Sequence, residues 1–205
     1  MDGLQRDVTL EPGKLPPYAV QVSVEDSRPQ ARVSDRFLSF ALDTSQLIGG
    51  KWWNPSASRV EHGSGSLHAP LFDFNRSGLD TLASALAPAY LRLGGSEADK
   101  VYYDLDTGGA SPPPVPPGFH SVLTHSQWDA ACEFTHRNGL GLVFTLNAGP
   151  AARKSDGSWD AGNAETLLNY SAQRGFRIDV WELGNEVNVF FSIHGWRNRV
   201  SASQY

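Results

Sequence analysis

Cysteine, long apolar runs and basic residues are all scarce in this sequence, and each shortage excludes something. Cys132 is the single cysteine among 205 residues, so no intrachain disulfide can form and redox chemistry indicates no compartment. No apolar run approaches the roughly 20 residues that a membrane-spanning helix needs. The opening segment MDGLQRDVTLEPGKLPP lacks the apolar core of a signal peptide, so the sequence gives no sign of export by that route.

The charge balance is mildly acidic. Lysine and arginine number 17 against 22 aspartates and glutamates, which gives a formal net charge of −5. Proteins that bind nucleic acid usually carry a basic patch or a pI above about 9, so nucleic acid is not an expected partner. The same balance argues against tight general binding of highly sulfated polyanions, although a local basic groove is compatible with it. At 40% hydrophobic and 19% charged residues, the composition is globular rather than disordered.

Apolar periodicity predicts alternating strands and helices along most of the chain. The predicted strands are 37–43, 90–94, 141–147 and 178–184. The predicted helices between them are 79–88, 124–139 and 163–175. Alternation of this kind gives a parallel sheet with helices outside it.

Local signals mark several helix ends. Ser77 is expected to cap the helix 79–88, whose leucines repeat along one face. Thr124 and Gln127 form the T-x-x-Q pattern of a capping box at the start of the next helix. The segment 201–204 has the similar pattern S-x-x-Q, which predicts the first turn of a further helix at the end of the sequence.

The ends of the predicted strands decide between two ways of closing the sheet. A doubly wound sheet concentrates its chemistry at one switch point, whereas a (β/α)8 barrel collects it at the carboxyl ends of many strands. Each predicted strand here ends in a polar or glycine-rich motif: Asp43-Thr44, Gly94-Gly95-Ser96, Asn147-Ala148-Gly149 and Asn185-Glu186. The sequence therefore predicts an α/β protein of the (β/α)8 TIM-barrel class. Four strand–helix units are half of a barrel, which typically needs about 250 residues, so only its N-terminal half is expected here.

The segment WELGNE (181–186) carries the strongest candidate for chemistry. Most glycosidases need two carboxyl groups flanking the scissile bond, one of which protonates the leaving oxygen. Glu186 lies at a strand tip and suits that acid role if apolar neighbours bury it and favour its neutral form. Asn185 can hydrogen-bond a sugar hydroxyl, and Glu182, earlier in the strand, is expected to be a buried structural carboxylate. The alternative for Glu186 is a helix cap or a surface glutamate.

WELGNE followed by Val187-Asn188 resembles the acid/base motif of the heparanase-type glycoside hydrolases, family 79. The segments RFLSFALDTSQ, LAPAYLRLGGSEAD and GLVFTLNAG are similar to the family's first three barrel strands, in the same order. The resemblance implies a (β/α)8 barrel with an attached β-sandwich. Residues 1–30 would then be a lead-in and a sandwich strand, formed by the alternating valines of 20–24. Residues 31–205 would be the first half of the barrel, truncated after strand four.

The resemblance also implies retaining hydrolysis of β-linked glucuronides, with no cofactor and no metal. Glu186 matches the family's proton donor, while Asp43, Ser96 and Asn185 match positions that contact the sugar in the cleaved subsite. Asp43 could equally cap the turn before Thr44, and Ser96 could cap a helix start. The family's nucleophile is a second glutamate on a later strand, and no residue of this sequence is assigned to it.

The implied partners are a glucuronic-acid-containing polysaccharide or glucuronide and the missing C-terminal half of the barrel. Relatives are commonly secreted, periplasmic or lysosomal, and the resemblance allows peripheral association with cell-surface glycans. The sequence itself assigns no compartment, and it leaves endo or exo action and the sulfation preference open.

Two other functions remain open. One is a retaining barrel glycosidase that acts on neutral sugars, such as an arabinofuranosidase or xylosidase. The other is a non-catalytic carbohydrate-binding protein or an inactive fragment. A basic residue near the site would favour an acidic sugar, and the sequence offers Lys51, Arg153 and Lys154 as candidates.

Overall fold

The computed structural model describes residues 31–52, 67–105 and 114–205. The chain divides into two units, 1–33 and 34–205, and all the described helices and strands belong to the second. The expected sandwich strand at residues 20–24 lies outside the described residues. Within the described ranges, no helix is long and apolar enough to cross a bilayer.

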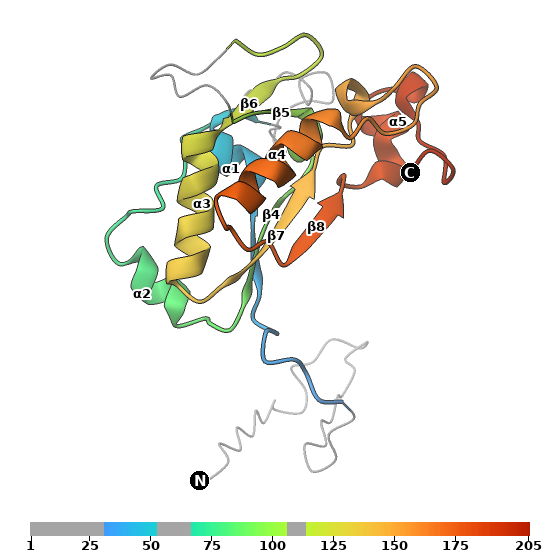
Figure 1. Cartoon of the computed structure of the whole chain (residues 1–205). Coiled ribbons are helices and arrows are strands. Elements are labelled where there is room, and N and C mark those ends of the chain that lie inside the picture. The colour runs from blue at the N-terminus through green and yellow to red at the C-terminus, as the bar shows by residue number, and fades with distance from the viewer. Residues whose placement is uncertain (1–30, 53–66, 106–113) are drawn as a thin grey trace, which may run out of the picture. The chain divides into compact units, whose positions relative to one another are not determined.

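A four-stranded parallel sheet forms the centre of the second unit (Figure 1). Its strands, in spatial order, are β1 (Phe40–Asp43), β4 (Tyr90–Gly94), β7 (Gly141–Leu146) and β8 (Val180–Leu183). Successive strands are neighbours, so the predicted parallel order is confirmed. The first strand begins three residues later than predicted, because residues 34–39 form a turn in which Phe37 and Leu38 are exposed.

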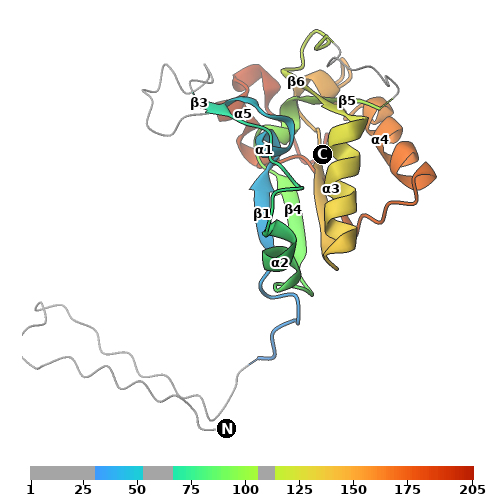
Figure 2. The same cartoon turned by 90° about the vertical axis from the view of Figure 1, so that its left-hand side faces the viewer.

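Two long helices, α3 (His125–Arg137) and α4 (Gly162–Gln173), lie on one side of this sheet (Figure 2). Trp128 of α3 is fully buried and packs edge-to-face on Phe144 of β7, with ring centroids 4.7 Å apart. Its indole N–H donates to the hydroxyl of Ser171 on α4 over 3.0 Å. Helix α3 starts with the predicted capping box of Thr124 and Gln127. The core therefore lies between the helices and one face of the sheet.

Helix α2 (Leu79–Ser84) differs from its prediction. Gly78 caps it in a left-handed conformation instead of Ser77, and the helix stops after six residues. Leu82 is 70% exposed, and Ala83 is the residue of the helix that is buried. A helix of less than two turns cannot present a continuous apolar stripe, so the leucine repeat does not form a packed face against the described residues.

Two smaller sheets complete the unit. The antiparallel pair is β2 (Gly50–Trp52) with β3 (Leu67–Ala69), and the parallel pair is β5 (Val101–Asp104) with β6 (Ser121–Thr124). The short helices are α1 (Thr44–Ile48) and α5 (Phe190–Ile193), with 3-10 turns at Ala98–Lys100, Pro150–Ala152, Val187–Val189 and Trp196–Asn198. The parallel β5–β6 pair lies between the predicted strands 90–94 and 141–147, where no strand was predicted.

Candidate active site

The carboxyl ends of the parallel strands bring the predicted site residues to one edge of the sheet. Asp43 ends β1, Ser96 follows β4, and Asn185 follows β8. The side-chain amide of Asn185 donates to the hydroxyl of Ser96 over 3.4 Å. The carboxylate of Asp43 lies against Gly95, where even a Cβ atom would collide with it. Residues up to 142 positions apart in the sequence thus share one site.

Asp43 caps the helix α1, which is one of the two roles that the sequence left open for it. Its carboxylate accepts hydrogen bonds from the backbone N–H (3.1 Å) and the hydroxyl (2.9 Å) of Ser45, at the start of α1. Partial burial raises the pKa of Asp43 above its ordinary value, and the two hydrogen bonds from Ser45 oppose that rise. Both capping oxygen contacts use Oδ1, while Oδ2 faces Gly95. The capping role therefore leaves one carboxylate oxygen on the side of the site.

Ser96 does not cap a helix in the structure. The 3-10 turn Ala98–Lys100 starts from Glu97, without a side-chain cap. The Ser96 hydroxyl instead accepts the hydrogen bond from Asn185. The structure therefore does not show the capping role, and the contact of Ser96 with a sugar stays a prediction.

A polar network covers the face of the sheet opposite the helices. The carboxylate of Glu182 accepts from Nε of Arg92 (2.8 Å) and from the hydroxyl of Thr145 (2.7 Å). A second guanidinium nitrogen of Arg92 donates to the side-chain oxygen of Asn185 over 3.4 Å. Glu182 was expected to be buried, but its side chain is half-buried. The ion pair connects the middle of the sheet to the site at its edge.

Arg92 is a site residue that the sequence analysis missed. It stands between Leu91 and Leu93 of β4, both fully buried on the helix side. Strands of a covered parallel sheet usually read as continuous apolar runs, so a charged residue inside one indicates a polar opposite face. That interruption in the segment YLRLG was the signal that could have identified Arg92.

Glu186 occupies a strained turn at the tip of β8. Its φ of 51° and ψ of 42° place it in the left-handed region, and no other non-glycine residue in the described ranges has a positive φ. Such backbone strain costs about 1–3 kcal/mol and clusters at functional sites. Its side chain is exposed, and its carboxylate has no hydrogen-bond or ion-pair partner among the described residues. The expected burial among apolar neighbours is therefore wrong for this part of the chain, because the turn carries the carboxylate beyond the sheet edge.

Gly184 makes this turn sterically possible. Its φ is 70°, and a Cβ atom there would lie 2.6 Å from Val187 and 2.7 Å from Ala148. Gly175 has a similar φ of 69° but open space around its Cβ position. An alanine would suffer backbone strain at both glycines, but it would collide with neighbouring atoms only at Gly184. Comparing the two positions therefore separates strain from collision.

We expect Gly184→Ala to destabilise the protein more than Gly175→Ala. Left-handed strain alone costs about 1–2 kcal/mol, and forcing a methyl group into a packed site costs about 1–3 kcal/mol more. Denaturant unfolding of both variants measures the difference. Equal losses at the two positions would show that the turn at Gly184 relaxes freely and does not hold the strand tip.

A buried carboxylate that the sequence analysis did not single out lies beneath this edge. Asp99 is 1% exposed, and its two oxygens accept backbone N–H groups of Ala148 and Asn185, each over 2.9 Å. Burial raises the pKa of Asp99 to about 6, against the lowering effect of these hydrogen bonds. Asp99 therefore joins the ends of β7 and β8 next to Glu186.

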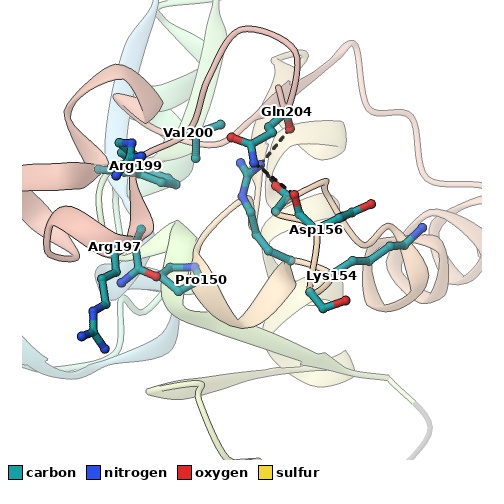
Figure 3. Close-up of a pocket in the computed structure, with 12 residues that line it drawn as sticks. Pro150, Lys154, Asp156, Arg197, Arg199, Val200 and Gln204 are labelled. Atoms are coloured by element: carbon teal, nitrogen blue, oxygen red, sulfur yellow. Dashed lines mark hydrogen bonds between the residues drawn. The ribbon is translucent and has the colours of Figure 1, made fainter.

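A basic cavity of about 320 Å³ lies between the loop after β7 and the segment after α5 (Figure 3). In the figure, Arg197 and Arg199 lie on one side of it, and Lys154 and Asp156 on the other. Its charged lining residues are Arg153, Lys154, Asp156, Arg197 and Arg199. Four cations against one carboxylate give the cavity a positive potential.

Nearby acids oppose the charge of the basic cavity only in part: Asp99 interacts with Arg153, and Asp156 with Lys154. Asp156 accepts from the backbone N–H (2.9 Å) and the hydroxyl (2.6 Å) of Ser158. Among the residues the structure describes, Lys154, Arg197 and Arg199 form no ion pair. One guanidinium nitrogen of Arg153 is buried without a hydrogen-bond partner. The cavity is therefore suited to an anionic group.

The sequence candidates for a basic residue have different outcomes. Arg153 and Lys154 line the basic cavity, and Arg197 and Arg199, which the sequence analysis did not consider, join them. The side chain of Lys51 lies outside the described part of the structure. In the described ranges, no cluster of three histidine, cysteine or acidic side chains is arranged to hold a metal ion.

Comparison with known proteins places the chain in a family. Residues 19–205 match the model of the N-terminal domain of glycosyl hydrolase family 79. Heparanase-like protein 3 of Arabidopsis thaliana is 32% identical over 171 residues, which cover 75% of this chain and 30% of that protein. Heparanase of Bos taurus is 28% identical, with 84% of this chain and 35% of that protein covered. The mouse protein named inactive heparanase-2 is 27% identical, with 86% and 36% covered.

The chain spans about a third of the length of the curated relatives it matches. The family match nevertheless covers nearly all of the chain, and it includes every site residue described above. This chain therefore belongs to the heparanase-type glycosyl hydrolases of family 79, as an N-terminal domain of that family.

Proposed function

We propose that this chain supplies the acid/base half of a retaining glycosidase that cleaves β-linked glucuronic-acid-containing glycans or glucuronides. Residues 31–205 would form the first half of a (β/α)8 barrel, and residues 1–30 a lead-in and a strand of an attached β-sandwich. The observation that carries the proposal is the turn at Glu186. Its backbone is strained and its carboxylate is unpaired among the described residues. It directly follows Asn185, which hydrogen-bonds Ser96 at one edge of a parallel sheet.

In this mechanism Glu186 first acts as an acid and then as a base. Its proton goes to the glycosidic oxygen while a second carboxylate, about 5–5.5 Å away, attacks the sugar carbon. The leaving alcohol departs, and Glu186 then takes a proton from the water that hydrolyses the glycosyl–enzyme ester. No residue of this chain is assigned as nucleophile, so that carboxylate would come from a later strand.

Asn185 would hold the sugar next to the reacting carbon. Arg92 and Ser96 fix its side-chain amide from two directions, which limits its rotamers. A fixed amide can hydrogen-bond the 2-hydroxyl, and that contact strengthens in an oxocarbenium-like transition state. Oδ2 of Asp43, at the end of β1, would bind a second hydroxyl of the same sugar.

The basic cavity favours an acidic glycan over a neutral one. Its walls follow the carboxyl ends of β7 and β8, so it lies on the chain segments that leave the proposed catalytic edge. A carboxylate or sulfate of a sugar next to the cleaved bond would neutralise its unpaired arginines. A glycosidase for neutral sugars would have no use for these charges.

The proposed activity is tested with the protein extended to the length of its relatives. We expect turnover of an aryl β-glucuronide and none of an aryl β-xyloside, with the first-formed sugar product keeping its β configuration by NMR. Turnover of the xyloside alone would support the neutral-sugar alternative. A folded protein that cleaves neither substrate would support a non-catalytic role, as the name of one relative, inactive heparanase-2, indicates for that protein.

Neutralising the basic cavity should weaken binding of acidic oligosaccharides. We expect the double change Arg197→Gln and Arg199→Gln to raise KM about 2- to 30-fold, since two exposed charge contacts contribute about 0.2–1 kcal/mol each. The effect should shrink at high salt because exposed charges are screened. Arg177→Gln is the matched control, because Arg177 is 81% exposed and precedes β8 at the opposite end of the strand. An equal KM change in the control would remove the cavity from substrate binding.

A further inference from the structure

The carboxylate of Asp99 hydrogen-bonds the segments that follow the two strands nearest the proposed acid/base. It belongs to the 3-10 turn Ala98–Lys100, which follows β4. One oxygen accepts the N–H of Ala148, after β7, and the other accepts the N–H of Asn185, after β8. These contacts join residues 49 and 86 positions away in the sequence.

Two glycines pack closely against Asp99. A Cβ atom on Gly149 would collide with the backbone carbonyl of Asp99. A Cβ atom on Gly184 would lie 3.3 Å from a carboxylate oxygen of Asp99. Gly149, after β7, therefore lies against the backbone of Asp99, and Gly184, after β8, lies near its carboxylate.

The anchored peptide lies inside the strained turn. Gly184 and Glu186 both have positive φ, and the N–H of Asn185 between them is the group that Asp99 holds. The N–H of Gly184 still follows the sheet pattern, since it donates to the carbonyl of Leu146 over 2.9 Å. Asp99 thus accepts the backbone N–H of the residue directly before Glu186.

We propose that Asp99 is a positioning residue, whose ionised carboxylate holds the Asn185 peptide so that Glu186 is aimed at the glycosidic oxygen. This inference rests on the proposed function, with Glu186 as the acid/base. Arg153, Lys100 and Tyr103 are the charged or titratable groups that interact with Asp99. The two cations favour its charged form, and the hydroxyl of Tyr103 accepts the N–H of Asn147 beside it.

The test is a double-mutant cycle in the protein extended to the length of its relatives. Asp99→Asn keeps the shape, but it turns an amide NH2 group toward one of the two N–H donors and so releases one strand end. We expect kcat to fall about 10²-fold on a substrate with a poor leaving group, because a misplacement of about 1 Å can cost that much. KM should change less than about threefold. An activated aryl glucuronide should lose much less, since its leaving group needs little protonation.

The decisive result is the effect of Asp99→Asn in the Glu186→Gln background. A residue that acts through Glu186 should cost nothing further once the acid is removed, so we expect no additional loss. An additional 10²-fold loss there would overturn the inference and leave the proposed function standing. No effect of Glu186→Gln by itself would instead overturn the proposed function.

A control separates positioning from simple loss of stability. Ser171→Ala also removes a buried acceptor, the hydroxyl that accepts the indole N–H of Trp128. Ser171 lies on the helix side of the sheet, away from the site. This substitution should lower the unfolding temperature and leave kcat unchanged. Asp99→Ser is the second variant, because it is smaller and keeps a hydroxyl acceptor. If both Asp99 variants lose cooperative unfolding, or if both substrates lose activity equally, Asp99 is a structural residue and the proposal is wrong.

Discussion

Replacing Glu186 by glutamine, in the protein extended to the length of its relatives, should lower kcat about 10²–10⁴-fold on a β-glucuronide with a poor leaving group. Glutamine keeps the shape of the side chain and removes the transferable proton. The carboxylate has no partner among the described residues, so the substitution breaks no hydrogen bond or ion pair there and should leave folding intact. Steady-state kinetics together with thermal unfolding measure both quantities on the same sample.

The choice of leaving group makes this result specific. An activated aryl glucuronide should lose less in its first step, since a good leaving group departs without protonation. Glu165→Gln is the matched control, because Glu165 is an exposed glutamate in the first turn of α4. Negligible and equal losses on both substrates would remove Glu186 from the mechanism.

Residues 1–205 alone should show no measurable turnover, and the remaining strands should restore it. A retaining mechanism needs its second carboxylate about 5–5.5 Å from the first, and the proposed nucleophile belongs to a later strand. Among the described residues, β1 and β8 are the outer strands of the sheet, and open strand edges promote association. We therefore also expect residues 1–205 to self-associate, as measured by light scattering.

Co-expression with the C-terminal part of the protein is the direct complement to that experiment. Recovered turnover that depends on Glu186 would support a barrel completed by the second half. Turnover by residues 1–205 alone that Glu186→Gln abolishes would contradict the prediction. It would mean that the second carboxylate already lies within this sequence.

Local sequence patterns predicted the four strands of the central sheet, its two long helices and the order in which these strands pair. The Thr124–Gln127 capping box depends on residues within one turn, so it can be read from the sequence. The polar strand ends were also readable, because parallel strands must bring their carboxyl ends to one edge. The prediction of helix α2 was wrong in its length, because periodicity by itself does not show where a short helix stops.

Tertiary structure alone decided how the site is held. The Arg92–Glu182 pair and the two contacts of Asp99 join residues 49 to 90 positions apart, so they depend on sheet register. The exposure and left-handed backbone of Glu186 likewise follow from how the chain leaves β8 at Gly184. The sequence determined which residues reach the edge of the sheet, because strand periodicity is local. Only the packed sheet could decide which charges meet there, because those distances are set by strands that are remote in the chain.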